Sequence, residues 1–371
     1  MKEFKYPDFN NSNLNISSTI AKYLGCKNDK PTIKLLEDEL NKGYKNIVFI
    51  CYDGLGIHPI DINLDDDAFL KKNIKMELTS TFPSTTTNAT TSLLSNKYPL
   101  EHGWFGWSLN FENINRNIDI FKNTDSATGE EIKIVNRPIK EEKHYFDYAN
   151  TDYEINTVFP NYVYEENAKA NHPFNPKHIS DFFNNVNMVL NKPGKQFLYA
   201  YLGEPDTTMH EHGVTSWHAK RLINKINKKT EKIFKNSKDT LFIITADHGQ
   251  VDIEGYVDFY NDKKLMDMLT IYPYLDARAV AFKVKDGKKE EFKDYFNLKY
   301  KEDFELHESK ELIDNGVFGL KGDIGHLLGD FIAIGTFTHK TALMTPKSHK
   351  FKGHHTSLTE EMMVPLIMFN N

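Results

Sequence analysis

The segment Asn46–Gly103 decides the fold. It opens with NIVFICYDGLG at residues 46–56, an apolar run that stops at an aspartate followed by glycines. An apolar run of this length, bounded by turn residues, predicts a buried strand. Asp53 then lies just past the carboxyl end of that strand, where open α/β sheets bind their ligands.

The same segment continues with TFPSTTTNATTSLLSNKYPLEHG at residues 81–103, a hydroxyl-rich turn that leads into a helical pattern. A turn between a strand and a helix can offer a hydroxyl as a nucleophile, and Thr85, Thr86 and Thr87 lie in this turn. The same residues suit the N-cap of a helix, and one threonine can serve both purposes. The segment is therefore predicted to supply half of an active site.

Length and charge limit the classes of function. A chain of 371 residues predicts one large α/β domain with an insertion, or two domains. Its 46 basic and 52 acidic residues give a net charge of −6, which argues against stable nucleic-acid binding. A small phosphate-containing substrate remains compatible with this charge, because bound metal ions can supply positive charge locally.

Cysteine content and hydropathy point to a cytoplasmic protein. The two cysteines, Cys26 and Cys51, imply no disulfide framework. The first residues, MKEFKYPDFNNSN, lack the apolar region of a secretory signal, and no stretch approaches the length of a membrane span. We expect no membrane association, and the sequence gives no indication of the oligomeric state.

The rest of the chain divides into segments with different sequence patterns. We expect the core to comprise residues 1–271 and 323–371, with helices near residues 176–190 and 216–234. GDFIAIGTF at residues 329–337 is expected to return to the core sheet. Residues 272–322 are predicted to form a small α+β insertion or cap. Residues 104–164 are irregular and aromatic-rich, as in lid-like loops that line a site.

Two further apolar runs end in aspartate, as the first one does. They are KQFLYAYLGEPD at residues 195–206 and DTLFIITADHGQVD at residues 239–252. His210 follows Asp206 by four residues, so both face the same way on a helical turn, and His248 follows Asp247 directly. Carboxylate and imidazole together suit Zn²⁺ and also Mn²⁺. One such aspartate is often only a cap, but three at strand ends indicate a metal site.

The motifs YDG, TFPSTTT…YPLEHG, EPDTTMHEHG, ADHG and GHHTSLTEEMMVPL occur in this order. The set resembles the alkaline phosphatase superfamily, and within it the nucleotide pyrophosphatase/phosphodiesterase branch with its bacterial type I phosphodiesterase relatives. The resemblance spans residues 46–252 and 326–371. It implies a three-layer α/β sandwich, in which a mostly parallel central sheet carries helices on both faces, plus a small α+β insertion.

The resemblance also implies two zinc ions and a threonine nucleophile. One ion would be held by Asp206, His210 and a late histidine. The other would be held by Asp53, Asp247, His248 and the nucleophile. The family form favours His355 as the late histidine, with His354 as the alternative. Counting back from Tyr98-Pro99 aligns Thr86 with the family nucleophile, with Thr85 and Thr87 as alternatives.

The implied activity is hydrolysis of a small phosphodiester or nucleotide through a phospho-threonine intermediate. Trp107 lies near the place where the family carries an asparagine that holds a phosphate oxygen, and Asn110 is a possible substitute. The aromatic residues of the lid-like loops either stack on a planar group of the substrate or pack in the core: Trp104, Phe105, Trp107, Phe159, Tyr162 and Tyr164.

Three alternatives remain open. A phosphomonoesterase or a phosphonate hydrolase of the same superfamily would use the same metals, and a non-catalytic metal sensor would keep only the ligands. A phosphomonoesterase typically needs a strong cation for the extra charge of its substrate. Arginine is scarce and absent from the site motifs, which favours diesters; the four arginines are Arg116, Arg137, Arg221 and Arg278.

Overall fold

The computed structural model describes residues 4–132, 143–161 and 171–371. Its central element is a six-stranded sheet in the order β2-β17-β8-β1-β7-β6. The strands are β2 (Ile74–Thr79), β17 (Met363–Asn370), β8 (Thr240–Thr245), β1 (Asn46–Tyr52), β7 (Gln196–Leu202) and β6 (Glu154–Val158). Strand β17 runs antiparallel to both of its neighbours, and the other five strands share one direction. The sheet is therefore mixed but mostly parallel, as expected.

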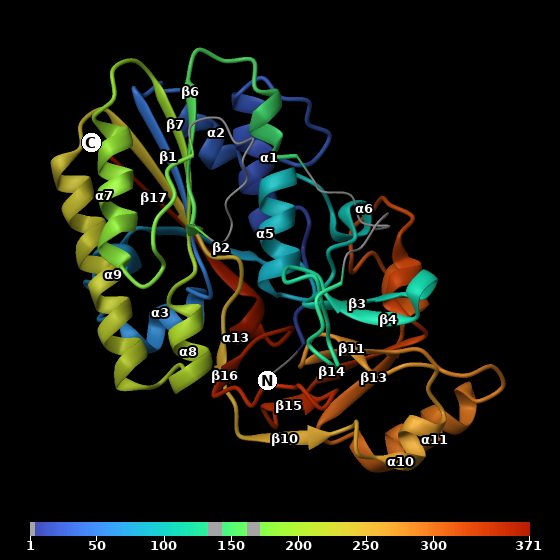
Figure 1. Cartoon of the computed structure of the whole chain (residues 1–371). Helices are drawn as coiled ribbons and strands as arrows, with labels where there is room; N and C mark the ends of the chain where they lie inside the picture. The colour runs from blue at the N-terminus through green and yellow to red at the C-terminus, as the bar shows by residue number, and fades with distance from the viewer. Residues whose placement is uncertain (1–3, 133–142, 162–170) are drawn as a thin grey trace.

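The apolar runs of the sequence form the middle of this sheet. Every residue of β1, β7 and β8 is buried, because helices cover both faces, as parallel sheets require. Figure 1 shows α7 and α9 on one side of the sheet and α1, α2 and α5 on the other. The covering helices are α1 (Asn13–Tyr23), α2 (Lys34–Leu40), α3 (Ile57–Asn63), α4 (Phe69–Lys72), α5 (Thr86–Ser95), α7 (Ile179–Leu190) and α9 (Trp217–Asn236).

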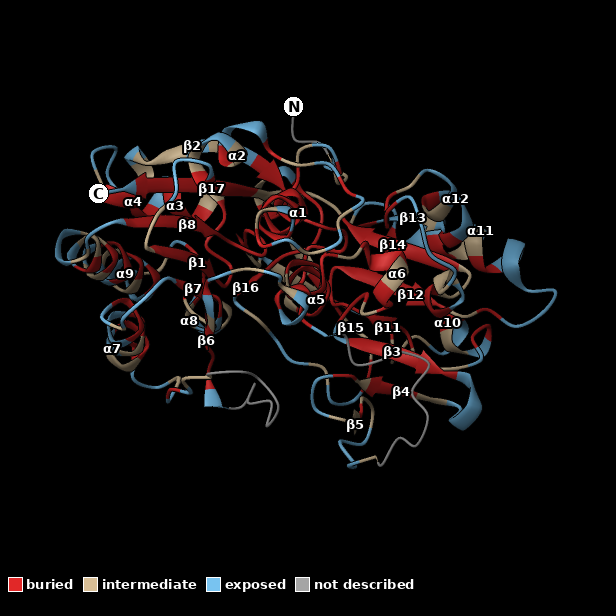
Figure 2. Ribbon diagram, turned by 90° about the horizontal axis from the view of Figure 1, so that it is seen from above, coloured by how far each residue is buried: buried red, intermediate tan, exposed pale blue. Residues whose placement is uncertain are grey.

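A second, antiparallel sheet of seven strands lies beside the first, in the order β13-β14-β12-β11-β3-β4-β5. Its strands are β3 (Ser108–Phe111), β4 (Arg116–Asp119), β5 (Thr124–Asp125), β11 (Tyr274–Leu275), β12 (Ala279–Phe282), β13 (Phe304–Glu308) and β14 (Phe331–Gly335). Figure 2 shows buried strands in both sheets and exposed residues on the outer helices. Residues 108–125 and 274–335 thus build one sheet together.

The expectation that residues 329–337 return to the core sheet is wrong. Strand β14 pairs with β12 and β13 in the second sheet, and the last strand added to the central sheet is β17. Two further strand pairs form two-stranded sheets of their own: β10 (Gly255–Asp258) with β15 (Lys340–Leu343), and β9 (Val251–Asp252) with β16 (Gly353–His354).

The remaining helices are short except for α11 on the second sheet. They are α6 (Pro99–His102), α8 (Asp206–His212), α10 (Lys263–Asp267), α11 (Lys289–Tyr300), α12 (Ser309–Asp314) and α13 (Thr359–Met362). No helix in residues 4–132, 143–161 and 171–371 combines the length and the apolar character that a membrane crossing needs.

Candidate active site

Three aspartates meet at the carboxyl edge of the central sheet. Asp53 follows β1, Asp206 begins α8 after β7, and Asp247 follows β8; these three strands are neighbours. The backbone N–H of Asp206 donates to the carbonyl of Asp53 at 3.1 Å. Gly54, with a φ of +69°, lets the chain turn here, since a Cβ on it would lie 3.0 Å from Asp206 Cβ. All three aspartates are buried.

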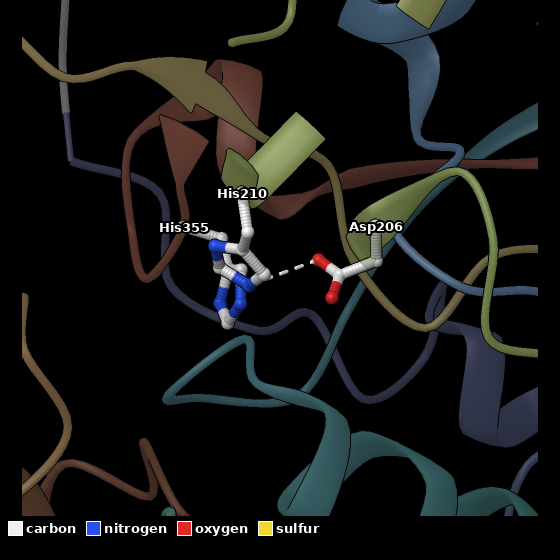
Figure 3. Close-up of side chains that lie close together, drawn as sticks. All are labelled: Asp206, His210 and His355. Atoms are coloured by element: carbon white, nitrogen blue, oxygen red, sulfur yellow. Dashed lines mark ion pairs between the residues drawn. The ribbon is translucent and has the colours of Figure 1, made fainter. Parts of the chain in front are cut away.

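Asp206, His210 and His355 form one cluster with the geometry of a metal site. Their ligand atoms lie within 4.8 Å of one another, and Asp206 Oδ1 is 3.2 Å from His210 Nε2. Figure 3 shows the three side chains turned toward one another. The four-residue spacing on α8 brings the first two together, and His355 arrives from the loop after β16.

Asp53, Asp206 and His248 form a second cluster of the same kind. His248 Nε2 lies 3.4 Å from Asp53 Oδ1, and the ring of His248 stacks on that of His355 with centroids 3.7 Å apart. Asp206 belongs to both clusters, so the two candidate cation positions are adjacent.

The Thr86 hydroxyl faces the second cluster. Its Oγ1 is 3.2 Å from His248 Nε2 and donates to Asp53 Oδ1 at 3.3 Å. Thr86 is the first residue of α5, Thr85 is its N-cap, and Thr87 is fully buried with a hydroxyl that has no hydrogen-bond partner. Of the three candidate threonines, Thr86 is the one whose hydroxyl hydrogen-bonds to the cluster.

Each histidine of the two clusters is oriented by a hydrogen bond between its Nδ1 atom and a backbone carbonyl oxygen. The Nδ1 atoms of His210, His248 and His355 lie 2.7, 2.9 and 2.6 Å from the carbonyl oxygens of Gly353, Gly249 and Ser84. Nδ1 therefore carries a proton, and Nε2 is the ring nitrogen that can bind a metal ion once its own proton is lost. This arrangement is typical of metal-ligating histidines.

Asp247 adds a third buried carboxyl group to the site. Its Oδ1 accepts from the backbone N–H groups of Gly54 and His248, both at 3.0 Å, while its buried Oδ2 has no hydrogen-bond partner. Burial and the charge of Asp53 raise the pKa of Asp247 well above its ordinary value. A buried carboxylate oxygen without a partner is costly, and a bound cation would relieve that cost.

The pKa of His248 also indicates a site that favours a bound cation. Burial alone would lower its pKa, but the carboxylates of Asp247, Asp53 and Asp206 outweigh burial and raise the pKa of His248 to about 10. The cluster thus attracts positive charge strongly in the absence of metal. The donor set of imidazole nitrogens and carboxylate oxygens fits Zn²⁺ or Mn²⁺.

His354 lies beside the clusters but outside both. Its ring packs against His210 and His355, with centroids 5.1 and 4.6 Å away. The backbone N–H of His355 lies 2.8 Å from its Nδ1, and Asp276 Oδ1 is 3.7 Å from the same nitrogen.

Trp107 and Asn110 have their contacts within the second-sheet region. Trp107 packs edge-on against Phe121 with centroids 6.2 Å apart, and the Asn110 amide donates to Asn117 Oδ1 at 3.0 Å. The other aromatic candidates differ from one another. Phe105 and Phe159 are buried in the core, Trp104 packs on Phe121, and residues 162 and 164 lie outside the described residues.

Three side chains that support the clusters had no signal in the sequence motifs. Tyr201 on β7 donates a short hydrogen bond to Asp53 Oδ2. Gln250 donates to Asp206 Oδ1 at 2.9 Å. Asp276, in the turn between β11 and β12, lies against His354. Tyr201 is part of an apolar run, and Asp276 lies in the predicted insertion, so neither position stands out in the sequence.

The family model for "Type I phosphodiesterase / nucleotide pyrophosphatase" matches residues 48–357, which is most of the chain. The chain belongs to this family. The match covers every residue of the two clusters and Thr86, and it confirms the resemblance to the alkaline phosphatase superfamily. A search of curated protein sequences gives no match.

Solved structures of similar fold include members of this superfamily. Murine ectonucleotide pyrophosphatase/phosphodiesterase 5 is 14% identical over 88% of each chain, with a TM-score of 0.65. Phosphonoacetate hydrolase from Sinorhizobium meliloti 1021, in complex with phosphonoformate, is 13% identical over 86% of this chain and 89% of that chain, with a TM-score of 0.61. The likeness shows an alkaline-phosphatase-like α/β fold for this chain, and the family indicates a hydrolase of phosphoric ester or anhydride bonds.

Proposed function

We propose that this protein is a two-metal phosphodiesterase of the nucleotide pyrophosphatase type, with Thr86 as its nucleophile. The observation that carries the proposal is the position of the Thr86 hydroxyl, 3.2 Å from His248 Nε2 and 3.3 Å from Asp53 Oδ1. A hydroxyl at the start of a helix, beside a cluster of carboxylates and imidazoles, suits attack on a bound phosphate.

We assign Asp206, His210 and His355 to one metal ion, and Asp53, Asp247, His248 and Thr86 to the other. Asp247 Oδ2 has no hydrogen-bond partner, and the Nε2 atoms of His210 and His248 lie 3.2 and 3.4 Å from Oδ1 of Asp206 and Asp53; both observations support this assignment. The ions would neutralise phosphoryl charge and lower the pKa of a bound hydroxyl. We propose Zn²⁺, with Mn²⁺ as the alternative, and a cytoplasmic location.

Individual residues of the chain then have separate roles in the proposed reaction. Thr86 Oγ1 attacks phosphorus, the Oγ–P bond forms, and the bond to the leaving oxygen breaks on the opposite side. Asp53 Oδ1 is the acceptor in reach of the hydroxyl proton. The positive end of the α5 dipole favours the phosphate anion at this place. Water then cleaves the phospho-threonine ester and restores Thr86.

Charge favours a diester over a monoester. Each arginine that the structure describes is engaged with a partner outside the two clusters: Arg278 pairs with Glu361, Arg116 with Glu130, and Arg221 lies over the Trp217 ring. A monoester carries one more negative charge, which the described site does not match with an arginine. An inactive alanine variant of the murine relative, made at a threonine, was solved in complex with AMP, and a nucleotide is our proposed substrate class.

The test compares hydrolysis of bis(p-nitrophenyl) phosphate and p-nitrophenyl phosphate by protein loaded with Zn²⁺ or Mn²⁺. We expect metal-dependent activity with preference for the diester, and a fall in kcat of roughly 10³-fold or more in Thr86→Val. Thr87→Val is the matched control, because its buried hydroxyl has no hydrogen-bond partner, and it should keep wild-type kcat. Preference for the monoester, or full activity in Thr86→Val, would contradict the proposal.

A further inference from the structure

Asp276 is a buried carboxylate next to the candidate site that no motif includes. Only 3% of its surface is exposed, and its Oδ1 has no hydrogen-bond partner. Burial raises the pKa of Asp276 to about 6, against the opposing effects of the Thr85 hydroxyl and the Arg278 backbone N–H. Burying such a group costs free energy. A functional role for Asp276 would explain why the fold retains this cost.

The backbone before Asp276 is strained. Leu275 has a φ of +91°, in the left-handed region that residues with a side chain rarely adopt. Gly106 lies so close that a Cβ on it would be 2.7 Å from the Leu275 carbonyl oxygen. Strain of this kind costs free energy and clusters at functional sites. Here it directs the turn between β11 and β12, and with it Asp276, toward the clusters.

Asp276 touches two segments that carry proposed site residues. One is the start of α5, where the Thr85 hydroxyl hydrogen-bonds to Asp276 and Thr86 follows as the next residue. The other is β16, where His354 Nδ1 lies 3.7 Å from Asp276 Oδ1. The His354 ring in turn packs on the rings of His210 and His355. Asp276 is thus the side chain through which the second sheet contacts the site.

We propose that Asp276 is a positioning residue: it holds Thr85 and His354 against the second sheet and so fixes the Thr86 hydroxyl and the two neighbouring histidines. This inference rests on the proposed function for its effect on catalysis, but its effect on metal binding does not. Side chains that orient ligands from outside the first coordination shell typically change metal affinity or activity 10- to 100-fold when they are replaced.

The test uses Asp276→Ala, which removes both carboxylate oxygens and with them the contacts to Thr85 and His354. We expect kcat on the diester to fall about tenfold or more with KM changed less than about threefold, and Zn²⁺ to bind about tenfold more weakly. Thr85→Val should reproduce the loss of kcat. The double variant should be no slower than the slower single variant, because both changes break one contact.

Asp262→Ala is the control, because Asp262 is also a partly buried acceptor but contacts only helices α10 and α11. It caps α10 and accepts from Tyr295, Lys299 and Tyr300, so its loss should lower Tm without changing kcat or Zn²⁺ affinity. Wild-type kcat and Zn²⁺ affinity in Asp276→Ala, or multiplying effects of the two single variants, would overturn the inference. Wild-type protein that hydrolyses no diester would contradict the proposed function, and Zn²⁺ affinity would then decide the role of Asp276.

Discussion

At the scale of single residues, Asp53 depends on Tyr201. The Tyr201 hydroxyl donates a short hydrogen bond to Asp53 Oδ2, which leaves Oδ1 to face Thr86 and His248. Without this bond the carboxylate can rotate. We predict that Tyr201→Phe lowers kcat on the diester about tenfold and weakens Zn²⁺ binding, because the orientation of the ligand is lost.

Steady-state kinetics and Zn²⁺ titration of Tyr201→Phe check this prediction. Tyr52→Phe is a matched control on β1, since its hydroxyl pairs with Thr230 inside the core, and it should leave kcat unchanged. Equal kcat and Zn²⁺ affinity in Tyr201→Phe and wild type would contradict a role for Tyr201 in orienting Asp53.

The sequence could place the aspartates but not their supports. Asp53, Asp206 and Asp247 each end an apolar run, and parallel strands bring such ends to one edge. No sequence pattern singles out Tyr201 or Asp276. Each matters because folding brings it next to residues that are distant in the chain. Their roles become visible only when β7 lies beside β1 and the second sheet lies against α5.

At the scale of elements, His102 joins α5 to α6. Its Nδ1 accepts the backbone N–H of Trp104 at 3.0 Å, so Nε2 carries the proton and donates to Ser92 Oγ at 2.9 Å. Burial, with a smaller effect of Lys97, lowers the pKa of His102 to about 3 from 6.5. The imidazole is therefore neutral in the folded protein over the ordinary pH range.

This shift predicts a loss of stability in mild acid. The native pKa lies below the unfolded value, so the unfolded chain binds the proton first, and stability falls as pH drops from 6.5 toward 3. One proton corresponds to about 1.4 kcal/mol per pH unit, or about 2 kcal/mol between pH 6.5 and pH 5. His102→Gln should remove that part of the pH dependence of the unfolding free energy, as measured by urea titration. Equal pH slopes in the two proteins would contradict this account of His102.

The long helices with a periodic apolar pattern were predictable from the sequence. The sheet to which each short strand belongs was not. The amphipathic pattern at residues 216–234 becomes α9 at Trp217–Asn236, and the helix expected at residues 176–190 becomes α7 at Ile179–Leu190. Strand β14 has a five-residue apolar run that fits either sheet, so its sequence could not indicate which one. Strands β3 and β4 lie within a segment expected to be loops, because four-residue strands give little periodicity.

At the scale of the whole molecule, the site concentrates negative charge between the two sheets. Asp247 and His248 both have raised pKa values in the metal-free protein, the latter to about 10. His248 is therefore protonated at pH 7.5 without metal, and a ligand must lose its proton to bind the ion. We predict that Zn²⁺ binding releases protons at pH 7.5 and that the affinity rises with pH.

Calorimetric titration with Zn²⁺ in buffers of different ionisation enthalpy measures this release. At least one proton per chain is expected, and Asp247→Asn should release fewer. Zn²⁺ binding without proton release, or an affinity that falls as pH rises from 6 to 8, would contradict the charge balance described for the clusters.

The central claim is that Thr86 becomes covalently bound to phosphorus during diester hydrolysis. The most direct measurement is peptide mass spectrometry on metal-loaded protein that is acid-quenched during turnover of a diester. The account predicts a phosphoryl ester on Thr86 that still carries one ester group of the substrate, and no adduct in Thr86→Val. An adduct on another residue, or turnover by Thr86→Val at the wild-type rate, would contradict it.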